Sequence, residues 1–280
     1  MRADGWMTAQ TPLGLFERER AKQGKTMERS EYGVMYRLEQ SYWWFMGKQF
    51  LVREQVRPLL SNRGSGQRIL DIGSGTGIIL KTLEEFGQAF GLEMSEEAIE
   101  FLKKRNLKHI VCSDAEQGLP FKDDSFSLIT CLDVLEHLDH DAALLTEMIR
   151  ICKEGGYVLV TVPAFNLLWS PHDSALHHRR RYTRTRLLGR LDGLNVRVVK
   201  ASYYNFMLSL PILAVRKLRV LFPEKGKGHS DFFIDLPGLV NRSLAALYKL
   251  EIFGLRFFRY PYGISLVLLL RKPQRERERP

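Results

Sequence analysis

The sequence predicts an α/β fold in which a doubly wound, parallel sheet carries helices on both faces. Two observations predict it. Between residues 67 and 205, short apolar runs alternate with segments of helical periodicity, and strands that alternate with helices of this length form parallel sheets. A glycine-rich turn, Gly73 to Gly77, joins the first apolar run to the first helix, as in Rossmann-like domains. Residues 67–205 are therefore the predicted Rossmann-like core.

A leader and a helical cap are predicted before this core. Residues 1–29 are polar and without sustained periodicity, which indicates a disordered leader. From Ser30 to Leu60 the pattern is helical, and Pro58 followed by the loop at residues 61–66 ends it. Residues 30–66 form the predicted N-terminal helical cap.

Inside the core, each strand is a short apolar run and the helices carry end signals. Ser95 is a predicted N-cap, with Glu96 and Glu97 in the first turn and Lys103 and Lys104 in the last, an order that complements the helix dipole. The predicted strands are residues 68–72, 89–93, 109–113, 126–132, 157–162 and 195–203. The predicted helices are residues 78–86, 96–105, 140–152 and 183–191.

A helical insertion separates the last two predicted strands. Residues 206–259 are strongly apolar, and breaks at residues 223–228 and at Pro237-Gly238 divide them into two or three helices. Residues 260–272 hold the last strand of the core, and residues 273–280 form a charged tail.

The formal net charge of +10 is the unusual feature of the composition. It indicates an anionic partner, which could be nucleic acid, an acidic membrane surface or an anionic small molecule. The arginine-rich tail contributes part of this excess, so a solvated tail is an equally good explanation.

The cysteines and the hydropathy indicate a reducing compartment. Cys112, Cys131 and Cys152 have no CxxC spacing, which argues against a disulfide framework and against a zinc site. The N-terminal stretch lacks the apolar run of a signal peptide, and no segment reaches the roughly 20 apolar residues that span a bilayer. We expect a cytoplasmic protein that is soluble or peripheral at the membrane.

The glycine turn points to a nucleoside-containing cofactor. It reads Asp71-Ile72-Gly73-Ser74-Gly75-Thr76-Gly77, so its spacing is GxGxG with an acidic residue before it. A dinucleotide site is expected to show GxGxxG, which disfavours a nicotinamide-dependent oxidoreductase. S-adenosylmethionine has no phosphate to bind, and its ammonium and sulfonium suit a nearby carboxylate.

Two further acids end the second and third predicted strands. Glu93 lies about 20 residues after Gly73, where a carboxylate accepts hydrogen bonds from both ribose hydroxyls. Asp114 is placed to accept from an adenine amino group. Taken singly, each acid could be an N-cap or a turn residue, but together with Asp71 they meet at the carboxyl edge of the sheet, where open α/β sheets bind ligands.

Two further motifs lie between the fourth and fifth predicted strands: Asp133-Val134-Leu135-Glu136-His137-Leu138 and Lys153-Glu154-Gly155-Gly156. Together with the glycine turn, Glu93 and Asp114, they resemble the class I S-adenosylmethionine-dependent methyltransferases over about residues 67–163. The similarity is greatest to the small-molecule branch that includes the quinone-biosynthesis methyltransferases. The resemblance implies a seven-stranded sheet with an antiparallel last strand, and Asp133 to His137 lining the reaction cleft. The chain departs from compact family members in its long insertion. The predicted cofactor contacts are Asp71, Gly73, Ser74, Gly75, Gly77, Glu93, Met94, Asp114, Ala115 and Asp133.

His137 and His178 are the candidate catalytic bases, because a hydroxyl or acidic carbon acceptor needs its proton removed. His137 follows the fourth strand and could instead pack near the next helix. His178 lies in the segment from His172 to Thr183, which suits recognition of an anionic group by arginine. A solvated basic loop and a metal site also fit this segment, but no spacing fixes a coordination geometry, so no metal is predicted. The predicted substrate contacts are Trp44, His172, Arg180 and Tyr182.

The expected acceptor is a small, hydrophobic molecule with an anionic or phenolic head, methylated on oxygen or carbon. The apolar, partly basic insertion could roof a pocket for such a molecule, contact a membrane, or dimerise. Trp44 and its aromatic neighbours could form a lid or pack plainly on the sheet. The alternatives are an RNA methyltransferase, disfavoured by the absence of the motifs of base methylation, and a non-catalytic binding protein with a methyltransferase fold.

Overall fold

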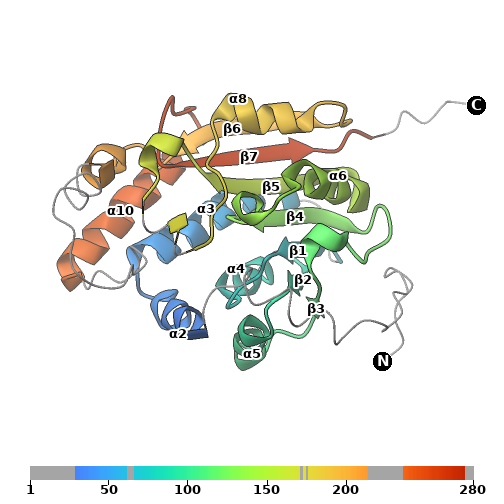
Figure 1. The fold of residues 1–280 in the computed structure, drawn as a ribbon, viewed down its shortest axis with the longest axis horizontal. Helices are drawn as coiled ribbons and strands as arrows, with labels where there is room; N and C mark the ends of the chain where they lie inside the picture. The colour runs from blue at the N-terminus through green and yellow to red at the C-terminus, as the bar shows by residue number, and fades with distance from the viewer. Residues whose placement is uncertain (1–28, 62–65, 171–172, 175, 214–235, 275–280) are drawn as a thin grey trace, which may run out of the picture.

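Seven strands form one sheet in the computed structural model, which describes residues 29–61, 66–170, 173–174, 176–213 and 236–274 (Figure 1). The strands are β1 (Arg68–Ile72), β2 (Gln88–Glu93), β3 (Ile110–Cys112), β4 (Phe126–Leu132), β5 (Cys152–Pro163), β6 (Arg197–Tyr204) and β7 (Ser265–Arg271). The predicted bounds of β1 and β4 are confirmed. β5 begins at Cys152 rather than at the predicted Tyr157, because Cys152 pairs with Phe126 and Gly155 donates to the carbonyl of Lys272.

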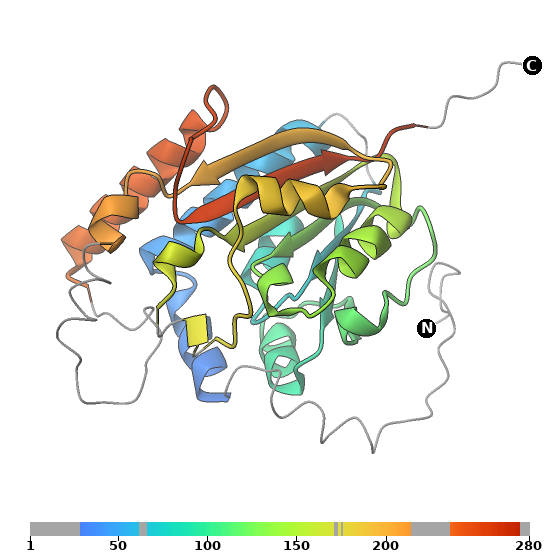
Figure 2. The ribbon, with the colours of Figure 1, turned by 45° about the horizontal axis from the view of Figure 1, so that its top comes forward.

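The strand order is β3-β2-β1-β4-β5-β7-β6. β7 is antiparallel to both of its neighbours, whereas the pairs formed by β1 to β5 are parallel. In Figure 2 the red β7 lies between β5 and the orange β6. The mostly parallel seven-stranded sheet with an antiparallel last strand is therefore confirmed. The order reverses between β1 and β4, and ligands of open α/β sheets bind at the carboxyl edge of such a switch point.

Helices cover both faces of the sheet (Figures 1 and 2). On one face, Leu70 and Ile72 of β1 share a core with α6 (Asp141–Ile151) and α8 (Arg184–Leu188). On the other face, Ile69 shares a core with α3 (Trp43–Leu60), α4 (Ile78–Leu83), α5 (Glu96–Lys104) and α10 (Gly238–Gly254). Alternate residues of a strand point to opposite faces, so the apolar run of β1 supplies both cores.

The N-terminal helical segment contains two helices, not one. α2 (Arg29–Leu38) ends before an extended Tyr42, and α3 then begins at Trp43. The predicted end of the helical segment at Leu60 is confirmed, and Pro58 lies in the last turn of α3, where it removes one backbone donor. The helix continues because Leu60 is buried in the core beneath it. Residues 1–28, the predicted leader, lie outside the described residues.

The insertion between β6 and β7 packs on α3. Asn241, in the first turn of α10, accepts a hydrogen bond from the backbone N–H of Trp43 and donates to the carbonyl of Ser41, so α10 supplies a partner for the start of α3. Gly47 of α3 lies against the ring of Tyr248. Residues 209–213 are helical, and the break predicted at residues 223–228 lies outside the described residues. Among the helices that the structure describes, none is long and apolar enough to cross a membrane.

Candidate active site

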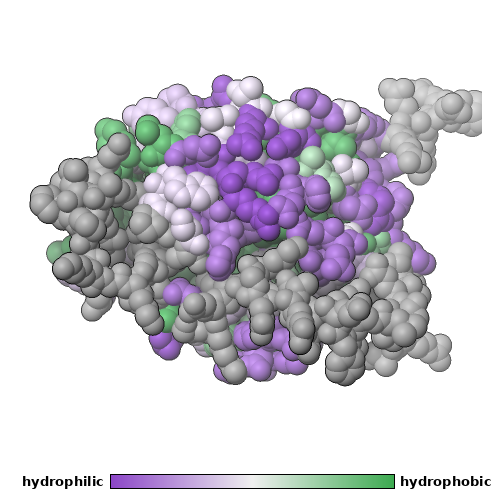
Figure 3. All heavy atoms as spheres, viewed as in Figure 1, coloured by the Kyte–Doolittle hydropathy of each residue, from purple (hydrophilic) through white to green (hydrophobic). Residues whose placement is uncertain are grey.

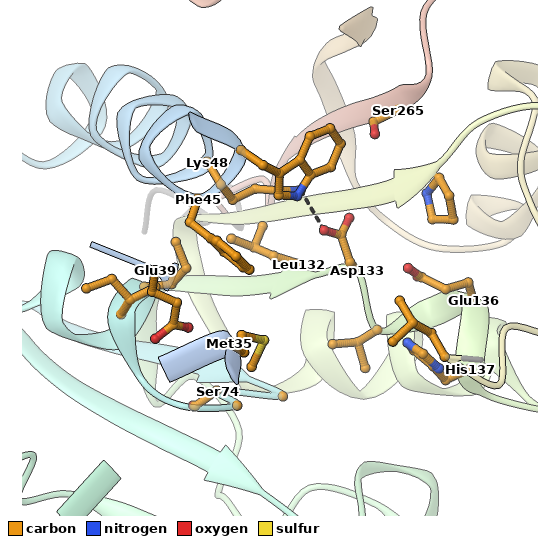
Figure 4. A pocket seen from close by; sticks show the side chains of 18 of the residues that line it. Met35, Glu39, Phe45, Lys48, Ser74, Leu132, Asp133, Glu136, His137 and Ser265 are labelled. Carbon is orange, nitrogen blue, oxygen red and sulfur yellow. Dashed lines mark hydrogen bonds and ion pairs between the residues drawn. The ribbon is translucent and has the colours of Figure 1, made fainter. Parts of the chain in front are cut away.

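A cavity of about 600 Å³ opens at the carboxyl edge of the sheet. Its floor is made by the residues that follow β1, β2, β3 and β4, and its walls come from α2, α3 and α10 and from residues 208–212. Figure 4 shows side chains from α2, α3, the turn after β1 and the segment after β4 around one space, with Asp133 and Glu136 directed into it. The lining joins the predicted cofactor turn to the predicted reaction cleft.

The turn after β1 requires glycine at Gly73 and Gly75. Gly73 and Gly75 have φ values of +71° and +53°, a region that glycine enters without steric cost. A Cβ on Gly73 would lie 2.5 Å from Cγ2 of Val134. The N–H groups of Gly73 and Ser74 donate to the carbonyl of Leu92 at 2.8 and 3.2 Å, which ties the turn to β2. The turn therefore presents bare backbone to the cavity.

Glu93 ends β2 beside this turn. One carboxylate oxygen accepts from the N–H of Gly75 at 2.8 Å, and the other accepts from the N–H groups of Met94 and Ser95 at 2.8 and 2.9 Å. Burial raises the pKa of Glu93, and the three backbone hydrogen bonds oppose that rise. Glu93 thus has its oxygens fixed at the cavity wall, where two hydroxyl donors could share them.

Asp71 and Asp114 occupy different positions relative to the cavity. Asp71 does not line it: its carboxylate accepts from the hydroxyl of Thr130 at 2.6 Å, beneath the turn. Burial, opposed by this hydrogen bond, raises the pKa of Asp71 to about 7. Asp114 and Ala115 do line the cavity, and Asp114 accepts from the N–H of Glu116 at 3.0 Å. Asp71 is therefore placed to support the turn, and Asp114 to face a ligand.

Lys48 reaches the cavity from α3 and binds Asp133 after β4. Its ammonium donates to Asp133 at 2.6 Å, to the hydroxyl of Tyr204 at 2.8 Å and to Thr161 at 3.2 Å (Figure 4). Thr161 donates to the second oxygen of Asp133 at 2.9 Å. Burial would raise the pKa of Asp133, but the charge and hydrogen bond of Lys48 hold it below its ordinary value. Asp133 is therefore an ionised carboxylate at the centre of the cavity.

Glu136, His137 and His178 form a cluster at the far end of the cavity. The short 3-10 helix η2 (Leu135–His137) carries the first two, and the N–H of Arg179 donates to the carbonyl of Glu136 at 2.8 Å, which brings His178 alongside. The two imidazole rings are 4.8 Å apart between centroids. Burial and the neighbouring His178 lower the pKa of His137 to about 4. Burial and the charge of Asp133 raise the pKa of Glu136 well above its ordinary value.

A buried ion pair orients His178. Nδ1 of His178 lies 2.8 Å from Asp173, whose carboxylate also accepts from Nε and Nη2 of Arg181 at 2.7 and 3.0 Å. Burial would raise the pKa of Asp173, but the hydrogen bonds from His178 and Arg181 keep it below its ordinary value. An ionised Asp173 fixes the Nδ1–H tautomer, so Nε2 faces Glu136 at 4.0 Å.

Some predicted contacts lie away from the cavity. Tyr182 is fully buried, and its hydroxyl donates to Asp141 at 2.7 Å. Arg180 lies against the carbonyl of Asp139 and the carboxylate of Asp141. Neither residue lines the cavity, and neither does Gly77, whose φ of +92° instead allows the turn to enter α4. His172 lies outside the described residues. Apart from Asp71, which lies beneath the turn, the other predicted contacts line the cavity.

Three important residues were not among the predicted contacts: Lys48, Glu136 and Asp173. Glu136 was implied only by the resemblance, as part of the cleft motif. Lys48 has no motif, and a lysine in a helix is ordinarily solvated. Asp173 stands five residues before His178, a spacing that could have suggested an Asp–His pair.

Comparison with known proteins gives this cavity a context. Residues 70–160 match the family model described as a methyltransferase domain. The matched stretch is less than half of the 280-residue chain. The matched domain runs from β1 into β5 and includes the glycine turn, Glu93, Asp114 and Asp133.

The curated relatives of this chain are named as methyltransferases of quinone biosynthesis. The chain is 28% identical over 131 residues to a ubiquinone biosynthesis O-methyltransferase of Aliivibrio fischeri, which is 42% of this chain and 56% of that protein. It is 31% identical over 156 residues to a ubiquinone/menaquinone biosynthesis C-methyltransferase of Cupriavidus taiwanensis, covering 52% of this chain and 60% of that protein. The chain thus spans little more than half the length of these relatives. It resembles the quinone-biosynthesis methyltransferases, as expected.

A solved structure shows the same fold over most of the chain. A SAM-dependent methyltransferase from Archaeoglobus fulgidus superposes with a TM-score of 0.50 over 91% of this chain and 99% of that one, at 18% identity. At this identity the likeness establishes the fold alone.

Proposed function

We propose that the protein is an S-adenosylmethionine-dependent methyltransferase that acts on a small, hydrophobic acceptor through an oxygen or carbon nucleophile. One observation carries the proposal: the glycine turn, Glu93, Asp114 and Asp133 line a single cavity together with an apolar wall. The names of the relatives agree with it, since they include one O-methyltransferase and one C-methyltransferase.

The cofactor half of the cavity fits S-adenosylmethionine. The bare turn at Gly73 and Gly75 would accept the methionine part, because its backbone lines the cavity without side chains in the way. Glu93 offers two oxygens to the ribose hydroxyls, and Asp114 and Ala115 would lie at the adenine. Ser74 and Met94 complete this half of the lining. The cofactor supplies a methyl group already activated on a sulfonium, so the chain mainly has to align the acceptor. Such alignment contributes roughly 7–11 kcal/mol.

The acceptor half of the cavity combines a large apolar surface with a few ionisable groups. Trp44 and Phe45 of α3, Leu208 and Ile212 before the undescribed part of the insertion, and Leu244 of α10 form the apolar surface. The insertion therefore contributes to the roof of the pocket. The same half of the cavity is lined by the Lys48–Asp133 pair and by the cluster of Glu136, His137 and His178. An apolar body with a hydroxyl or phenolic head would fit this arrangement.

His178 is the better placed of the two candidate bases. Asp173 holds its Nδ1–H, which leaves Nε2 as the acceptor nitrogen, as in other Asp–His pairs. His137 has a pKa of about 4 and is a weaker base at neutral pH. The guanidinium of Arg181 is already hydrogen-bonded to Asp173. Lys48 is therefore the cation that would favour an acceptor with an anionic head group over one with a phenolic head group.

Calorimetric titration with S-adenosylmethionine and S-adenosylhomocysteine tests the proposal. We expect micromolar binding by the wild type and at least tenfold weaker binding by Glu93→Gln, which keeps the side chain's shape and part of its acceptor capacity. Glu100→Ala, an exposed change on α5, should bind like the wild type. A folded wild type that binds neither ligand would refute the proposal and favour the non-catalytic alternative.

We further propose that α10 and the loop after it contact an anionic membrane, from which a hydrophobic acceptor could be taken. Leu239, Leu250, Phe257 and Phe258 expose more than half of their surface, and the exposed Arg259 follows the two phenylalanines. Figure 3 shows apolar surface at the end of the molecule near α10, whereas most of the other coloured surface in that view is hydrophilic. Co-sedimentation with vesicles that contain anionic lipid should fall on Phe257→Ser/Phe258→Ser. Equal sedimentation of wild type and variant would contradict this proposal.

A further inference from the structure

We propose that Glu136, His137 and His178 bind a divalent transition-metal cation in the acceptor half of the cavity. One ligand atom from each residue, two imidazole nitrogens and a carboxylate oxygen, lies within 4.8 Å of the other two. Figure 4 shows Glu136 and His137 side by side on η2, below Asp133. The presence of a cation does not depend on the proposed function, but its role in the reaction does.

The distances are close to those of a bound site. Zinc–nitrogen and zinc–oxygen bonds are about 2.0–2.2 Å, so two ligands of one ion are at most about 4.4 Å apart. The carboxylate of Glu136 and Nε2 of His178 are 4.0 Å apart. Small rotations of side chains, without backbone movement, would therefore bring the three ligands onto one ion.

Glu136 provides an independent reason to expect a cation. Its side chain has no exposed surface, and among the described residues neither carboxylate oxygen accepts a hydrogen bond. A buried polar group without a partner costs about 1–3 kcal/mol, and more for a charged group. A cation beside the carboxylate would remove this cost, whereas the neighbouring Asp133 increases it.

The surroundings of His178 are those of a metal ligand. Histidines that bind metals donate their other ring N–H to a carboxylate or carbonyl, which fixes the tautomer and the ring orientation. Nδ1 of His178 lies 2.8 Å from Asp173, and Arg181 holds that carboxylate with two hydrogen bonds. The ring is therefore fixed with Nε2 directed to Glu136.

The ligand set selects the class of ion. Two imidazoles and one carboxylate suit Zn²⁺, Co²⁺ or Fe²⁺, whereas Mg²⁺ and Ca²⁺ prefer oxygen ligands. Three protein ligands leave a coordination position open to the cavity, as in catalytic zinc sites. An acceptor hydroxyl in that position would lose its proton to water more readily. The resulting oxyanion would form its bond to the methyl carbon as the carbon–sulfur bond breaks, and the electron pair would stay on sulfur.

This cation and direct proton transfer to His178 are alternatives, because both need Nε2 of His178. With the cation bound, His178 is a ligand and the acceptor's proton leaves to solvent. Without it, His178 takes the proton. The metal-binding measurement below separates the two.

The test is titration of the chelator-treated chain with Zn²⁺ by calorimetry, and with Co²⁺ by visible absorption. We expect one ion per chain in the wild type, and at least tenfold weaker binding in Glu136→Gln and in His178→Gln. Cys112→Ser and His109→Gln are the controls, because Cys112 and His109 are exposed groups outside the cavity that could bind metal adventitiously. Both controls should bind like the wild type.

Two outcomes would overturn the proposal: no stoichiometric binding by the wild type, or binding that Cys112→Ser or His109→Gln removes and Glu136→Gln keeps. Titration of Glu136→Gln with S-adenosylmethionine checks the fold, since Glu136 lies in the acceptor half. If the wild type bound the metal but not S-adenosylmethionine, the cation site would be supported and the proposed function refuted. If the wild type bound S-adenosylmethionine but not the metal, the proposed function would be supported and the cation site refuted.

Discussion

At the scale of single residues, burial and the nearest partner together determine the pKa values of the acids around the cavity. Asp71 is almost fully buried, and its nearest partner is the hydroxyl of Thr130. Asp133 is also part of the buried network, but it has the ammonium of Lys48 at 2.6 Å. The first therefore has a raised pKa and the second a lowered one. Replacing Asp71, or the partner of Asp133, should therefore change the free energy of unfolding in different ways.

Asp71→Asn should change how stability depends on pH. In the unfolded chain Asp71 ionises at about 3.8, and in the folded chain at about 7. As the pH rises through this interval, the unfolded state loses its proton first, so the wild type loses on the order of 4 kcal/mol of stability. Asparagine does not titrate. Urea unfolding between pH 4 and 7.5 should show the stability of Asp71→Asn rising relative to the wild type.

A matched control for this measurement is Asp123→Asn, because Asp123 is largely exposed. Its difference from the wild type should not grow across the same interval. If wild type and Asp71→Asn changed in parallel, Asp71 would be ionised in the folded state and the assignment would be wrong.

Lys48→Met should destabilise the protein by about 2 kcal/mol. Methionine keeps most of the buried volume, but Asp133 loses its cation, and breaking a fully buried pair costs about 3–5 kcal/mol. The value is smaller here because 36% of the Asp133 side chain is accessible from the cavity. Adding Asp133→Asn to Lys48→Met should recover much of the loss. Lys81→Met, on the exposed surface of α4, should cost less than about 0.5 kcal/mol in the same urea titration.

Residue roles could be predicted where a motif places an acid at a strand end, and less well elsewhere. Glu93 and Asp114 line the cavity as expected because the end of a strand fixes its side chains in space. Lys48 could not be found this way, since its burial depends on β6 and β5, which supply Tyr204 and Thr161 far along the chain. The arginines at 179–181 looked equivalent in sequence, but only Arg181 faces Asp173 and the cavity.

At the scale of elements, the contact between α3 and α10 is unusually close. An added Cβ on Gly47 would lie 1.9 Å from Cδ1 of Tyr248, whose ring is fully buried. Such a ring cannot move without disturbing its neighbours, because protein interiors are close-packed. The small residue in α3 therefore sets the distance at which α10 can pack.

Gly47→Ala should destabilise the protein by about 1–2 kcal/mol. Overpacking costs about 1–3 kcal/mol, and the better helix propensity of alanine offsets up to about 1 kcal/mol of that. Gly33→Ala in α2 is the matched control, since its Cβ would meet nothing nearer than 4.0 Å, and it should be neutral or stabilising. Urea unfolding of both variants checks the pair; the same sign for both would show that α10 adapts to the larger side chain.

Helices and strands were predicted well where burial and periodicity agree. The bounds of β1 and β4 were correct because their apolar runs are buried on both faces of the sheet. The split between α2 and α3 was missed because Glu39 and Ser41 fit a helical pattern locally. The break is favoured by tertiary contacts: Glu39 accepts from Arg105 and Thr76.

At the scale of the whole molecule, α2 is fastened across the cofactor turn to α5. Arg105 donates to Glu39 at 2.5 Å and to the carbonyl of Thr76 at 2.7 Å, and its guanidinium stacks on Tyr36. This charge pair is almost completely buried. Because Met35 of α2 and Glu39, the residue directly after α2, line the cavity, the pair holds one wall of the cavity closed.

Arg105→Gln should loosen this wall selectively. We expect faster hydrogen exchange of the amides of α2 and roughly tenfold weaker binding of S-adenosylmethionine, with little change in the strands of the sheet. Arg53→Gln, which breaks an exposed pair with Glu85, should leave α2 unchanged. Uniformly faster exchange throughout the sheet would mean that Arg105 stabilises the whole fold rather than this wall.

The overall topology could be predicted because strand and helix signals alternate and the motifs resemble a known family. The antiparallel last strand came from that resemblance and not from periodicity, which carries no direction. The form of the insertion could not be predicted, since its apolar residues suit a roof, a membrane contact or a dimer equally well, and only the packing of α10 on α3 places it.

The position of β7 has a consequence for the order in which the chain can fold during synthesis. β6 pairs only with β7 in the sheet, and β7 follows it by some sixty residues. Until residues 265–271 leave the ribosome, β6 therefore has no neighbouring strand, and one side of β5 is an open edge able to pair with other chains. The first five strands and their helices can assemble early, but the sheet is completed late, so a nascent chain halted within the insertion would be the form most prone to aggregate.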